Sequence, residues 1–357
     1  MNNIFSFVFK IFAFPLSIIY LVVSSNRRML YRIGFFKQYS FRLPIISIGN
    51  LTMGGSGKTP LTLWIGKFIE SHHKKTMVVM RGYKGALEKA GGIISSSRSI
   101  GISASDFGDE AILYKRKLSN CSVLVGKNRV LNLLKYYKQE EADVALLDDG
   151  FQHLKISPDL NILLFDVSLP MHQYKVVPMG YMREHMNAAV NADVIILNRC
   201  ELVDNDTIKL LEDKISLITK KLIPIYRTKY IFKYIYDKDD KIHFTELDLS
   251  SLNIIAFAGI ASPENFFKNL KGLNANLVET YSFDDHKEYT IEILEKLRKS
   301  AKESNSILIT TEKDIVKLSK ISDINDVYYL GMELKFINNN NELDLKNRIL
   351  KTLRLPL

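Results

Sequence analysis

The chain has 357 residues, of which 46% are hydrophobic, so it is long enough to fold as two domains with buried cores. Its net charge of +10 suits a nucleic acid, an anionic membrane surface or a phosphorylated substrate, and does not choose among them. The two cysteines, Cys121 and Cys200, are too few and too isolated for a disulfide framework or a metal site, which leaves reduced thiols.

The first predicted element is an apolar helix from Ile4 to Val23, which a lysine and a proline interrupt. Its basic residues, Arg27 and Arg28 among them, follow the apolar run, whereas those of a signal peptide precede it. A length of about 20 residues just reaches a bilayer span, but an interfacial helix or a short tilted anchor fits nearly as well. A buried helix of a soluble protein is the remaining alternative. We expect residues 1–28 to associate with a membrane and, if they span it, the following residues to be cytoplasmic.

The next element is a strand, a glycine-rich loop and a helix. An apolar run from Ile45 predicts a buried strand, and Gly-Lys-Thr then opens a helical pattern that continues to Ile69. This is the context of a P-loop, whose backbone N–H groups and helix N-terminus bind phosphate. Lys58 would reach the terminal phosphates, and the Thr59 hydroxyl would bind Mg²⁺. The general pattern has glycine six positions before the lysine, where this chain has Thr52, and a plain glycine-rich turn is the alternative.

The predicted ATP-binding residues are therefore the loop and the first helical turn. They are Thr52, Met53, Gly54, Gly55, Ser56, Gly57, Lys58, Thr59 and Pro60.

Strand and helix patterns alternate after the P-loop. The strand patterns cover 77–80, 122–125, 144–147, 162–165 and 194–197, and the helix patterns cover 108–118 and 128–137. A stretch rich in Gly and Ser at 91–105 predicts a loop with at most a weak hairpin. This alternation predicts an α/β fold: a P-loop NTPase-like core with a mostly parallel sheet between helices.

The pattern changes near Leu222. Residues 222–244 are rich in Tyr, Ile and Phe and predict a β-hairpin, and a second alternating segment follows. We therefore expect a P-loop domain at 29–221, a hairpin linker at 222–248 and a smaller α/β domain at 249–357, besides the N-terminal hydrophobic helix.

Polar residues follow the predicted strands, at the edge where open α/β sheets bind ligands. An apolar strand that ends in Asp148 and Asp149 is the Walker B arrangement, in which a carboxylate holds Mg²⁺. Successive strand residues point to opposite faces, so one acid would serve Mg²⁺ and the other the acceptor. A polar turn is the alternative. Asp109, Glu110, Arg129, Arg183, Glu184 and His286 would, taken singly, be ordinary surface or helix-terminal residues.

Taken together, these residues resemble the tetraacyldisaccharide 4′-kinases, a family that acts in lipid A synthesis. The shared motifs follow in order along nearly the whole chain: Gly49-Asn50-Leu51-Thr52 through Pro60, Arg81-Gly82-Tyr83, Gly108-Asp109-Glu110, Asp148-Asp149-Gly150-Phe151-Gln152-His153, Pro178-x-Gly180, Arg183-Glu184, Phe257-Ala258-Gly259-Ile260, Phe283-x-Asp285-His286 and Thr311-Glu312-Lys313-Asp314. Threonine is the family's usual residue at position 52. The chain departs from the family pattern at Met182, at Lys287 and at Pro158-Asp159.

The resemblance implies transfer of the γ-phosphate of ATP to the 4′-hydroxyl of a tetraacyldisaccharide 1-phosphate, which gives lipid IVA. It implies catalysis by Lys58 and by Asp109 as the base, with His286 as its partner across a closing cleft. The Mg²⁺ ligands would be Thr59, Asp148, Asp149 and Glu184. Contacts to the lipid substrate would come from Arg81, Tyr83, Glu110, Arg129, Gln152, His153 and Arg183.

The expected partners are ATP, the acylated disaccharide lipid and the membrane surface, with no nucleic acid. The expected location is the inner membrane, with the active site on its cytoplasmic face. The alternative function is a membrane-associated P-loop switch ATPase, although many of those carry an additional lysine where this chain has Met53. A membrane-tethered binding module is a third option, but it gives no reason for the Asp148-Asp149 pair.

Overall fold

A computed structural model describes residues 2–83, 85–97, 102–245, 249–260, 263–285, 287–318, 321 and 324–356. It divides into two compact units. The first unit comprises Met1–Ile102, Tyr114–Lys229 and Leu334–Leu357, and the second comprises Ser103–Leu113 and Tyr230–Glu333.

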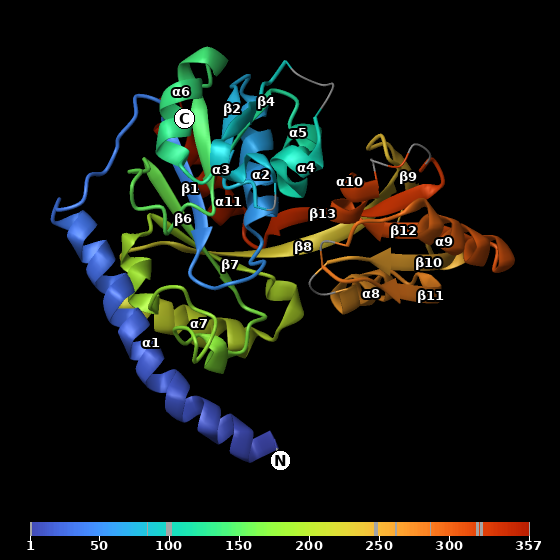
Figure 1. The fold of residues 1–357 in the computed structure, drawn as a ribbon, viewed down its shortest axis with the longest axis horizontal. Helices are drawn as coiled ribbons and strands as arrows, with labels where there is room; N and C mark the ends of the chain where they lie inside the picture. The colour runs from blue at the N-terminus through green and yellow to red at the C-terminus, as the bar shows by residue number, and fades with distance from the viewer. Residues whose placement is uncertain are drawn as a thin grey trace. The chain divides into compact units, whose positions relative to one another are not determined.

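The first unit is built on a mostly parallel sheet (Figure 1). In spatial order its strands are β3 (Gly92–Ile94), β4 (Cys121–Val125), β2 (Thr76–Met80), β5 (Val144–Asp148), β1 (Ile45–Asn50), β6 (Leu160–Asp166), β7 (Val194–Asn198) and the start of β8 (Ile225–Tyr236). Only β3 is antiparallel to its neighbour among the strand pairs described for this unit. The five residues of β2, β4, β5 and β7 and the six of β1 are all buried, which is why these strands appear as continuous apolar runs.

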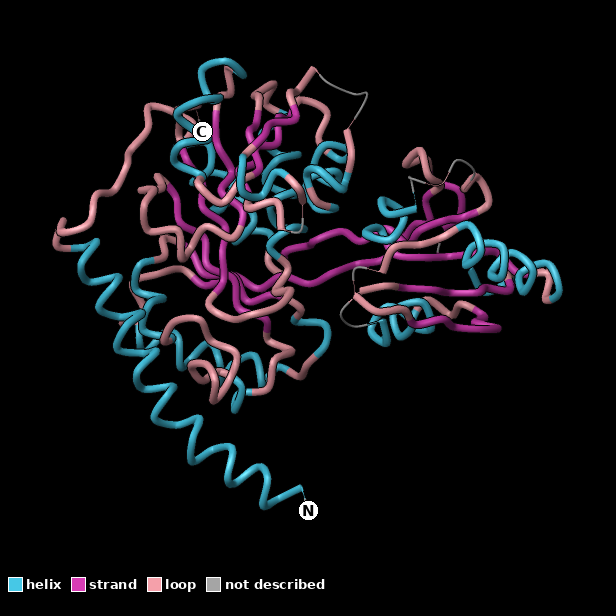
Figure 2. The backbone as a smooth tube through the Cα atoms, in the orientation of Figure 1, coloured by secondary structure: helices cyan, strands magenta, loops and turns pink. Residues whose placement is uncertain are grey.

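Helices cover both faces of this sheet, as the tube in Figure 2 shows. They are α1 (Asn2–Arg32), α2 (Lys58–Ser71), α3 (Leu87–Ala90), α6 (Arg129–Glu140), α7 (Asn205–Ile218) and α11 (Asn339–Thr352), with 3₁₀ turns at Met171–Gln173, Met186–Asn191 and Cys200–Leu202. The side chain of Asn128 caps α6 by accepting a hydrogen bond from Leu131 N at 3.3 Å. Val130 and Leu133 of α6 then pack against the apolar side chains of β1, β2 and β5. The helix at Asp109–Lys117 (α5) begins in the second unit and ends in the first.

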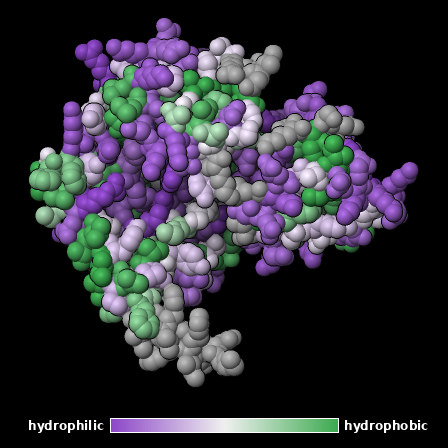
Figure 3. All heavy atoms as spheres, in the orientation of Figure 1, coloured by the Kyte–Doolittle hydropathy of each residue, from purple (hydrophilic) through white to green (hydrophobic). Residues whose placement is uncertain are grey.

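The helix α1 carries many exposed apolar side chains. Phe12, Ile19 and Val23 are 68%, 59% and 62% exposed, and Figure 3 shows hydrophobic residues gathered along this helix. Ala13 is buried, and the Ser17 hydroxyl donates a hydrogen bond to the carbonyl of Val176 at 2.7 Å, so one side of α1 packs on the first unit. None of the helices in the described part of the chain is long and apolar enough to cross a membrane.

The second unit has its own sheet, in the order β11, β10, β12, β13, β8, with β9 paired to β8. Its elements are α4 (Ala104–Phe107), β9 (Ile242–Thr245), a 3₁₀ turn at Leu249–Ser251, β10 (Asn253–Ala258), α8 (Pro263–Gly272), β11 (Asn276–Ser282), α9 (Ile291–Glu303), β12 (Ser306–Thr311), α10 (Glu312–Leu318) and β13 (Val327–Phe336). Strands β10 to β13 are parallel to one another, and Ile254, Phe266 and Leu270 lie in their core.

The α/β fold with a mostly parallel sheet is confirmed, as are the strands expected at 77–80, 122–125, 144–147, 162–165 and 194–197. The hairpin expected at 222–244 is formed by β8 and β9, which are antiparallel. The stretch at 91–105, expected as a loop, contributes β3 to the sheet edge and includes the start of α4.

The two units do not follow the predicted ranges 29–221, 222–248 and 249–357. Residues 103–113 belong to the second unit, and the last helix, α11, belongs to the first. The end of the chain packs on α2: the ring centroids of Trp64 and Phe336 are 5.1 Å apart, and Lys346 lies over the Trp64 ring. A linear division of the sequence cannot show this return of the chain.

Candidate functional site

The loop between β1 and α2 has the conformation of a phosphate cradle. Gly54 and Gly57 have φ angles of 95° and 92°, which favour glycine because they place the backbone in the left-handed region. A Cβ added at Gly54 or Gly55 would meet nothing within 4 Å, so this part of the loop faces open space. Helix α2 begins at Lys58, with neither a side-chain cap nor an acidic residue in its first turn. Its N-terminal N–H groups therefore favour an anionic ligand.

Thr52 does not need to be glycine in this loop. It pairs with Met182 as an isolated bridge, and its carbonyl and hydroxyl accept hydrogen bonds from the Asn50 amide at 2.9 and 3.2 Å. Two backbone hydrogen bonds flank this bridge, from Met53 N to Tyr181 O at 2.7 Å and from Arg183 N to Leu51 O at 2.6 Å. The start of the loop is thus held by residues 181–183, and the glycines are confined to its second half.

Lys58 points back toward the end of β1. Its Nζ donates to Asn50 Oδ1 at 3.3 Å and lies 3.6 Å from Asp149 Oδ1. The Arg183 guanidinium binds both carboxylate oxygens of Asp149, at 2.9 and 2.7 Å, and also donates to Asn50 Oδ1. A lysine, an arginine and an acid therefore meet at one point beside the P-loop.

Asp148 and Asp149 occupy different environments. Asp148 is the buried last residue of β5, and its Oδ2 accepts a hydrogen bond from the Tyr114 hydroxyl at 2.9 Å. Its Oδ1 is buried and has no hydrogen-bond partner among the described residues. Burial raises the pKa of the Asp148 carboxyl, although the charge of Lys58 opposes this shift. An orphaned carboxylate oxygen beside a phosphate cradle is the place where a cation would bind.

Asp149 is already neutralised by cations. Burial alone would raise the pKa of the Asp149 carboxyl, but the hydrogen bonds from Arg183 and the charges of Lys58 and Arg129 hold it well below its ordinary value. The Arg129 guanidinium donates to the Asp149 carbonyl at 3.0 Å and is itself buried. Burial lowers the pKa of Arg129, against the opposing charges of the two acids. Asp149 therefore organises the cations of the site.

Glu184, one of the predicted metal ligands, is paired with an arginine of α1. Arg28 donates to both of its carboxylate oxygens, at 2.7 and 3.0 Å, and to the Phe151 carbonyl at 3.1 Å. The side chains of Arg28 and Glu184 are only 16% and 8% exposed. In this structure the carboxylate of Glu184 ties α1 to the segment that holds the P-loop.

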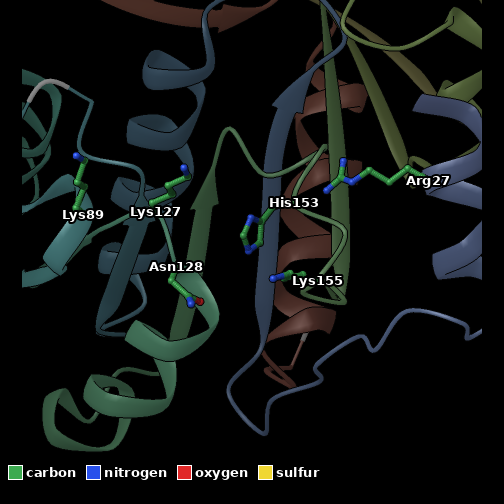
Figure 4. Close-up of a pocket in the computed structure, with 6 residues that line it drawn as sticks. All are labelled: Arg27, Lys89, Lys127, Asn128, His153 and Lys155. Carbon is green, nitrogen blue, oxygen red and sulfur yellow. The ribbon is translucent and has the colours of Figure 1, made fainter. Parts of the chain in front are cut away.

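Gln152 and His153 follow the acid pair. Gln152 donates to the Asn50 carbonyl at 2.9 Å, and His153 lines a cavity of about 380 Å³ (Figure 4). The other residues that line the cavity are Arg27, Lys89, Lys127, Asn128 and Lys155. Burial, aided by the charges of Arg129, Lys155 and Arg27, lowers the pKa of His153 to about 3. Four cations around a neutral histidine make this cavity suited to an anion.

The remaining predicted site residues lie elsewhere. Arg81 and Tyr83 follow β2 and are largely exposed, with Arg81 paired to Glu88 at 2.6 Å. Asp109 and Glu110 open α5 and belong to the second unit. His286 lies outside the described residues.

Two residues that hold the site together, Asn50 and Tyr114, were not predicted from the sequence. Asn50 bonds to Lys58, Arg183 and Thr52, yet the sequence shows only a polar residue at a strand end. Tyr114 looks like an ordinary apolar position of α5. The roles of Asn50 and Tyr114 follow from the side chains to which they are hydrogen-bonded in the folded protein.

No group of three or more His, Cys, Asp or Glu side chains that could hold a metal ion occurs within the described ranges. This does not argue against Mg²⁺ bound with a nucleotide, because Mg²⁺ usually takes one or two protein oxygens and completes its shell with phosphates and water. The orphaned Oδ1 of Asp148 and the hydroxyl of Thr59, in the first turn of α2, fit that pattern.

The chain is similar to known proteins along nearly its whole length. The family model described as Tetraacyldisaccharide-1-P 4′-kinase matches residues 9–354. A protein named tetraacyldisaccharide 4′-kinase from Desulfotalea psychrophila is 35% identical, over 93% of this chain and 94% of its own. One of the same name from Flavobacterium psychrophilum is 31% identical, over 93% and 94%. A crystal structure of LpxK from Aquifex aeolicus in complex with ATP has a TM-score of 0.77 and 28% identity, and the match covers 95% of this chain and 98% of that one.

Proposed function

Since this chain belongs to the tetraacyldisaccharide-1-P 4′-kinase family, we propose that it transfers the γ-phosphate of ATP to the 4′-hydroxyl of a tetraacyldisaccharide 1-phosphate. The observation that carries this proposal is the meeting of Lys58, Asp149 and Arg183 at the mouth of the P-loop. Phosphoryl transfer depends mainly on positioning and on neutralising charge, and this cluster supplies both. No observation favours the switch ATPase.

The donor side of the reaction is assigned to the first unit. The loop amides and the N-terminus of α2 would bind the β- and γ-phosphates. The Lys58 ammonium would stabilise the negative charge on the phosphoryl group as it is transferred. Asp149 holds Lys58 and Arg183 in place through its ion pairs. Both cations are thereby oriented before the substrate arrives.

Mg²⁺ would be held by Thr59 and Asp148, together with phosphate oxygens. When bound, it would neutralise the phosphates and fix their geometry for in-line attack. Tyr114 fixes one oxygen of Asp148 through its hydrogen bond, so the other oxygen is the one left for the ion.

The acceptor would place its 1-phosphate in the cavity lined by Arg27, Lys89, Lys127 and Lys155. Four cations around an open volume of about 380 Å³ suit a phosphate group and part of a sugar. Gln152 donates to the carbonyl of Asn50 and Arg129 to the carbonyl of Asp149, so both are fixed beside the P-loop. We assign the attacking hydroxyl's base to Asp109, with His286 as its partner.

The site would act at the cytoplasmic face of the inner membrane, where such a lipid is embedded. The support is α1, which carries exposed apolar side chains and, near its end, the exposed Arg27. Replacing Phe12, Ile19 and Val23 by serine should reduce sedimentation with anionic vesicles, whereas leucine at the same positions should preserve it. Equal sedimentation of the two variants would show that the contact lies elsewhere.

One assay tests the function directly. The purified protein is incubated with γ-labelled ATP and vesicles that contain a tetraacyldisaccharide 1-phosphate. Label in the lipid is expected with the wild-type protein and absent with Lys58→Ala of equal thermal stability. Release of labelled phosphate without any labelled lipid would instead identify an ATPase.

A further inference from the structure

The outer face of α6 has no role in the reaction described above. Leu131 and Leu134 are 60% and 51% exposed there, and Lys135 and Lys138 are exposed beside them. These four positions are three or four residues apart, so they form one stripe along the helix. The opposite side of α6 is the one that packs against the sheet. The two exposed leucines are therefore not needed to hold α6 in place.

The charge around this stripe favours an anionic partner. The segment from Lys127 to Gln139 contains no acidic residue, and its exposed side chains are those of lysine, leucine, asparagine and glutamine. The outer face of α7 differs, because acids share the stripe of its exposed leucines. The residues of that stripe are Asp206, Leu210, Asp213 and Leu217. An apolar stripe with basic neighbours is the pattern of helices that lie on anionic membranes.

The stripe begins beside the cavity assigned to the 1-phosphate of the acceptor. Lys127 and Asn128, the residue that caps α6, line this cavity from one side, and Arg27 of α1 lines it from the other (Figure 4). Leu131 follows Asn128 by three residues, and the exposed Val23 lies one helical turn before Arg27. Exposed apolar side chains therefore adjoin the cavity-lining residues on both helices.

We propose that α6 is a second membrane contact, and that its stripe lies on the same anionic phospholipid bilayer as α1. This proposal rests on the proposed function, because it takes the bilayer that holds the acceptor as the partner. Leu131 and Leu134 enter the acyl boundary, while Lys135 and Lys138 keep their ammonium groups among the lipid phosphates. With a membrane contact on each side, the cation-lined cavity opens onto the lipid headgroups.

Sedimentation of the full-length protein with vesicles tests this contact apart from the reaction. The vesicles contain phosphatidylglycerol and phosphatidylcholine, without acceptor and without ATP. Leu131→Ser combined with Leu134→Ser should weaken binding about tenfold, because two apolar side chains no longer leave water. Methionine at both positions should preserve binding. Both side chains are exposed, so the melting temperature should be unchanged.

The chain offers a matched control on α7. Leu210→Ser combined with Leu217→Ser removes two leucines that are 58% and 81% exposed but share their stripe with acids, and it should leave vesicle binding unchanged. The charge of the α6 stripe has its own test. Lys135→Gln combined with Lys138→Gln should weaken binding to the anionic vesicles at least about tenfold and leave binding to pure phosphatidylcholine unchanged.

The α6 contact is overturned if its serine variant binds vesicles as the wild type does, or if the α7 variant loses as much. Unchanged vesicle binding with a lower mass of the free protein would identify the stripe as a contact between two copies of this chain. Protein that binds vesicles through α6 but labels no lipid would contradict the proposed function and leave the contact standing. Wild-type protein that does not sediment would overturn the membrane location together with the α6 contact.

Discussion

At the scale of single residues, two adjacent acids have opposite electrostatic settings. Asp148 is buried, one of its carboxylate oxygens has no hydrogen-bond partner in the part of the chain that the structure describes, and burial raises its pKa. Asp149 is surrounded by Lys58, Arg183 and Arg129, which hold its pKa below the ordinary value against the effect of burial. Asp148 is thus a buried carboxylate with one oxygen left open, and Asp149 is a carboxylate that several cations already neutralise.

This contrast predicts opposite effects of two conservative changes. Asp148→Asn should leave stability unchanged or raise it, because it removes a buried charge, but should lower kcat by at least about 100-fold if the carboxylate binds Mg²⁺. That is more than the roughly 10- to 100-fold loss typical of residues that only orient a metal ligand.

Asp149→Asn should instead lower the unfolding free energy by about 1–3 kcal/mol, because Arg183 and Lys58 lose their partner. Urea unfolding and steady-state kinetics measure both, and equal destabilisation by the two variants would contradict the contrast.

His153 predicts a pH dependence of stability. Its pKa is lowered from 6.5 to about 3 by burial and by nearby cations, so between these values the unfolded chain binds a proton that the folded chain does not. Stability should therefore fall as the pH decreases from about 6.5 toward 3. His153→Gln should make the decline less steep, as measured by urea unfolding at a series of pH values. An unchanged slope would show that His153 is solvated in the folded protein.

At the scale of elements, α1 is fixed to the first unit by a short polar strap. Arg28 reaches both oxygens of Glu184 and the carbonyl of Phe151, and Glu184 adjoins Arg183 of the P-loop cluster. The helix that carries the exposed apolar surface is therefore linked to the phosphate site through two neighbouring residues.

Breaking this strap should be costly. Arg28→Ala leaves the carboxylate of Glu184 buried without a partner, so the unfolding free energy should fall by about 3 kcal/mol. Arg27→Ala is the control, because Arg27 makes a longer and exposed hydrogen bond to the Gln152 carbonyl and should cost less than about 0.5 kcal/mol.

Glu184→Gln should destabilise the protein without raising the Mg²⁺ concentration that half-saturates activity. A raised requirement for Mg²⁺ would restore Glu184 as a metal ligand.

At the scale of the whole molecule, the second unit contains a buried ion pair of its own. Asp314 and Lys317 are 0% and 5% exposed and lie 2.8 Å apart. Asp314 accepts from Gly259 N at 3.0 Å and Lys317 donates to Gly259 O at 2.6 Å, so the pair holds the end of β10 against α10. The motifs around Gly259 and Asp314 are far apart in the sequence, but in the fold they form one buried hydrogen-bonded cluster.

Removing one partner of this pair should unfold the second unit selectively. Lys317→Met leaves a charged Asp314 in the core, at a cost of about 3–5 kcal/mol, whereas Lys317→Met combined with Asp314→Leu should recover part of that loss. Hydrogen exchange should show lost protection in β10 and β12 and unchanged protection in β1 and β5. Uniform loss across both units would mean that they unfold as one.

Much of the fold was predictable because it is local. The buried parallel strands are contiguous apolar runs, and the hairpin of β8 and β9 follows from its composition. The bounds of the units were not predictable, because α11 returns to the first unit and 103–113 joins the second. Such returns depend on packing between segments that are distant in the chain, whereas the hydrophobic periodicity of a sequence reports only on residues that are close in the chain.

The phosphate chemistry of this protein is encoded in a short stretch of its sequence. Gly54, Gly57, Lys58 and Thr59 act through backbone angles and a helix N-terminus that a dozen neighbouring residues specify. How the rest of the site is used depends on contacts between distant segments. Asn50 meets Arg183, which lies 133 positions away in the chain, and one oxygen of Asp148 has no hydrogen-bond partner among the described residues. The burial of a carboxylate and its ion pairs depend on side chains that are distant in the sequence. For this reason the folded structure, and not the order of residues, distinguishes Asp148 from Asp149 as the acid open to a cation.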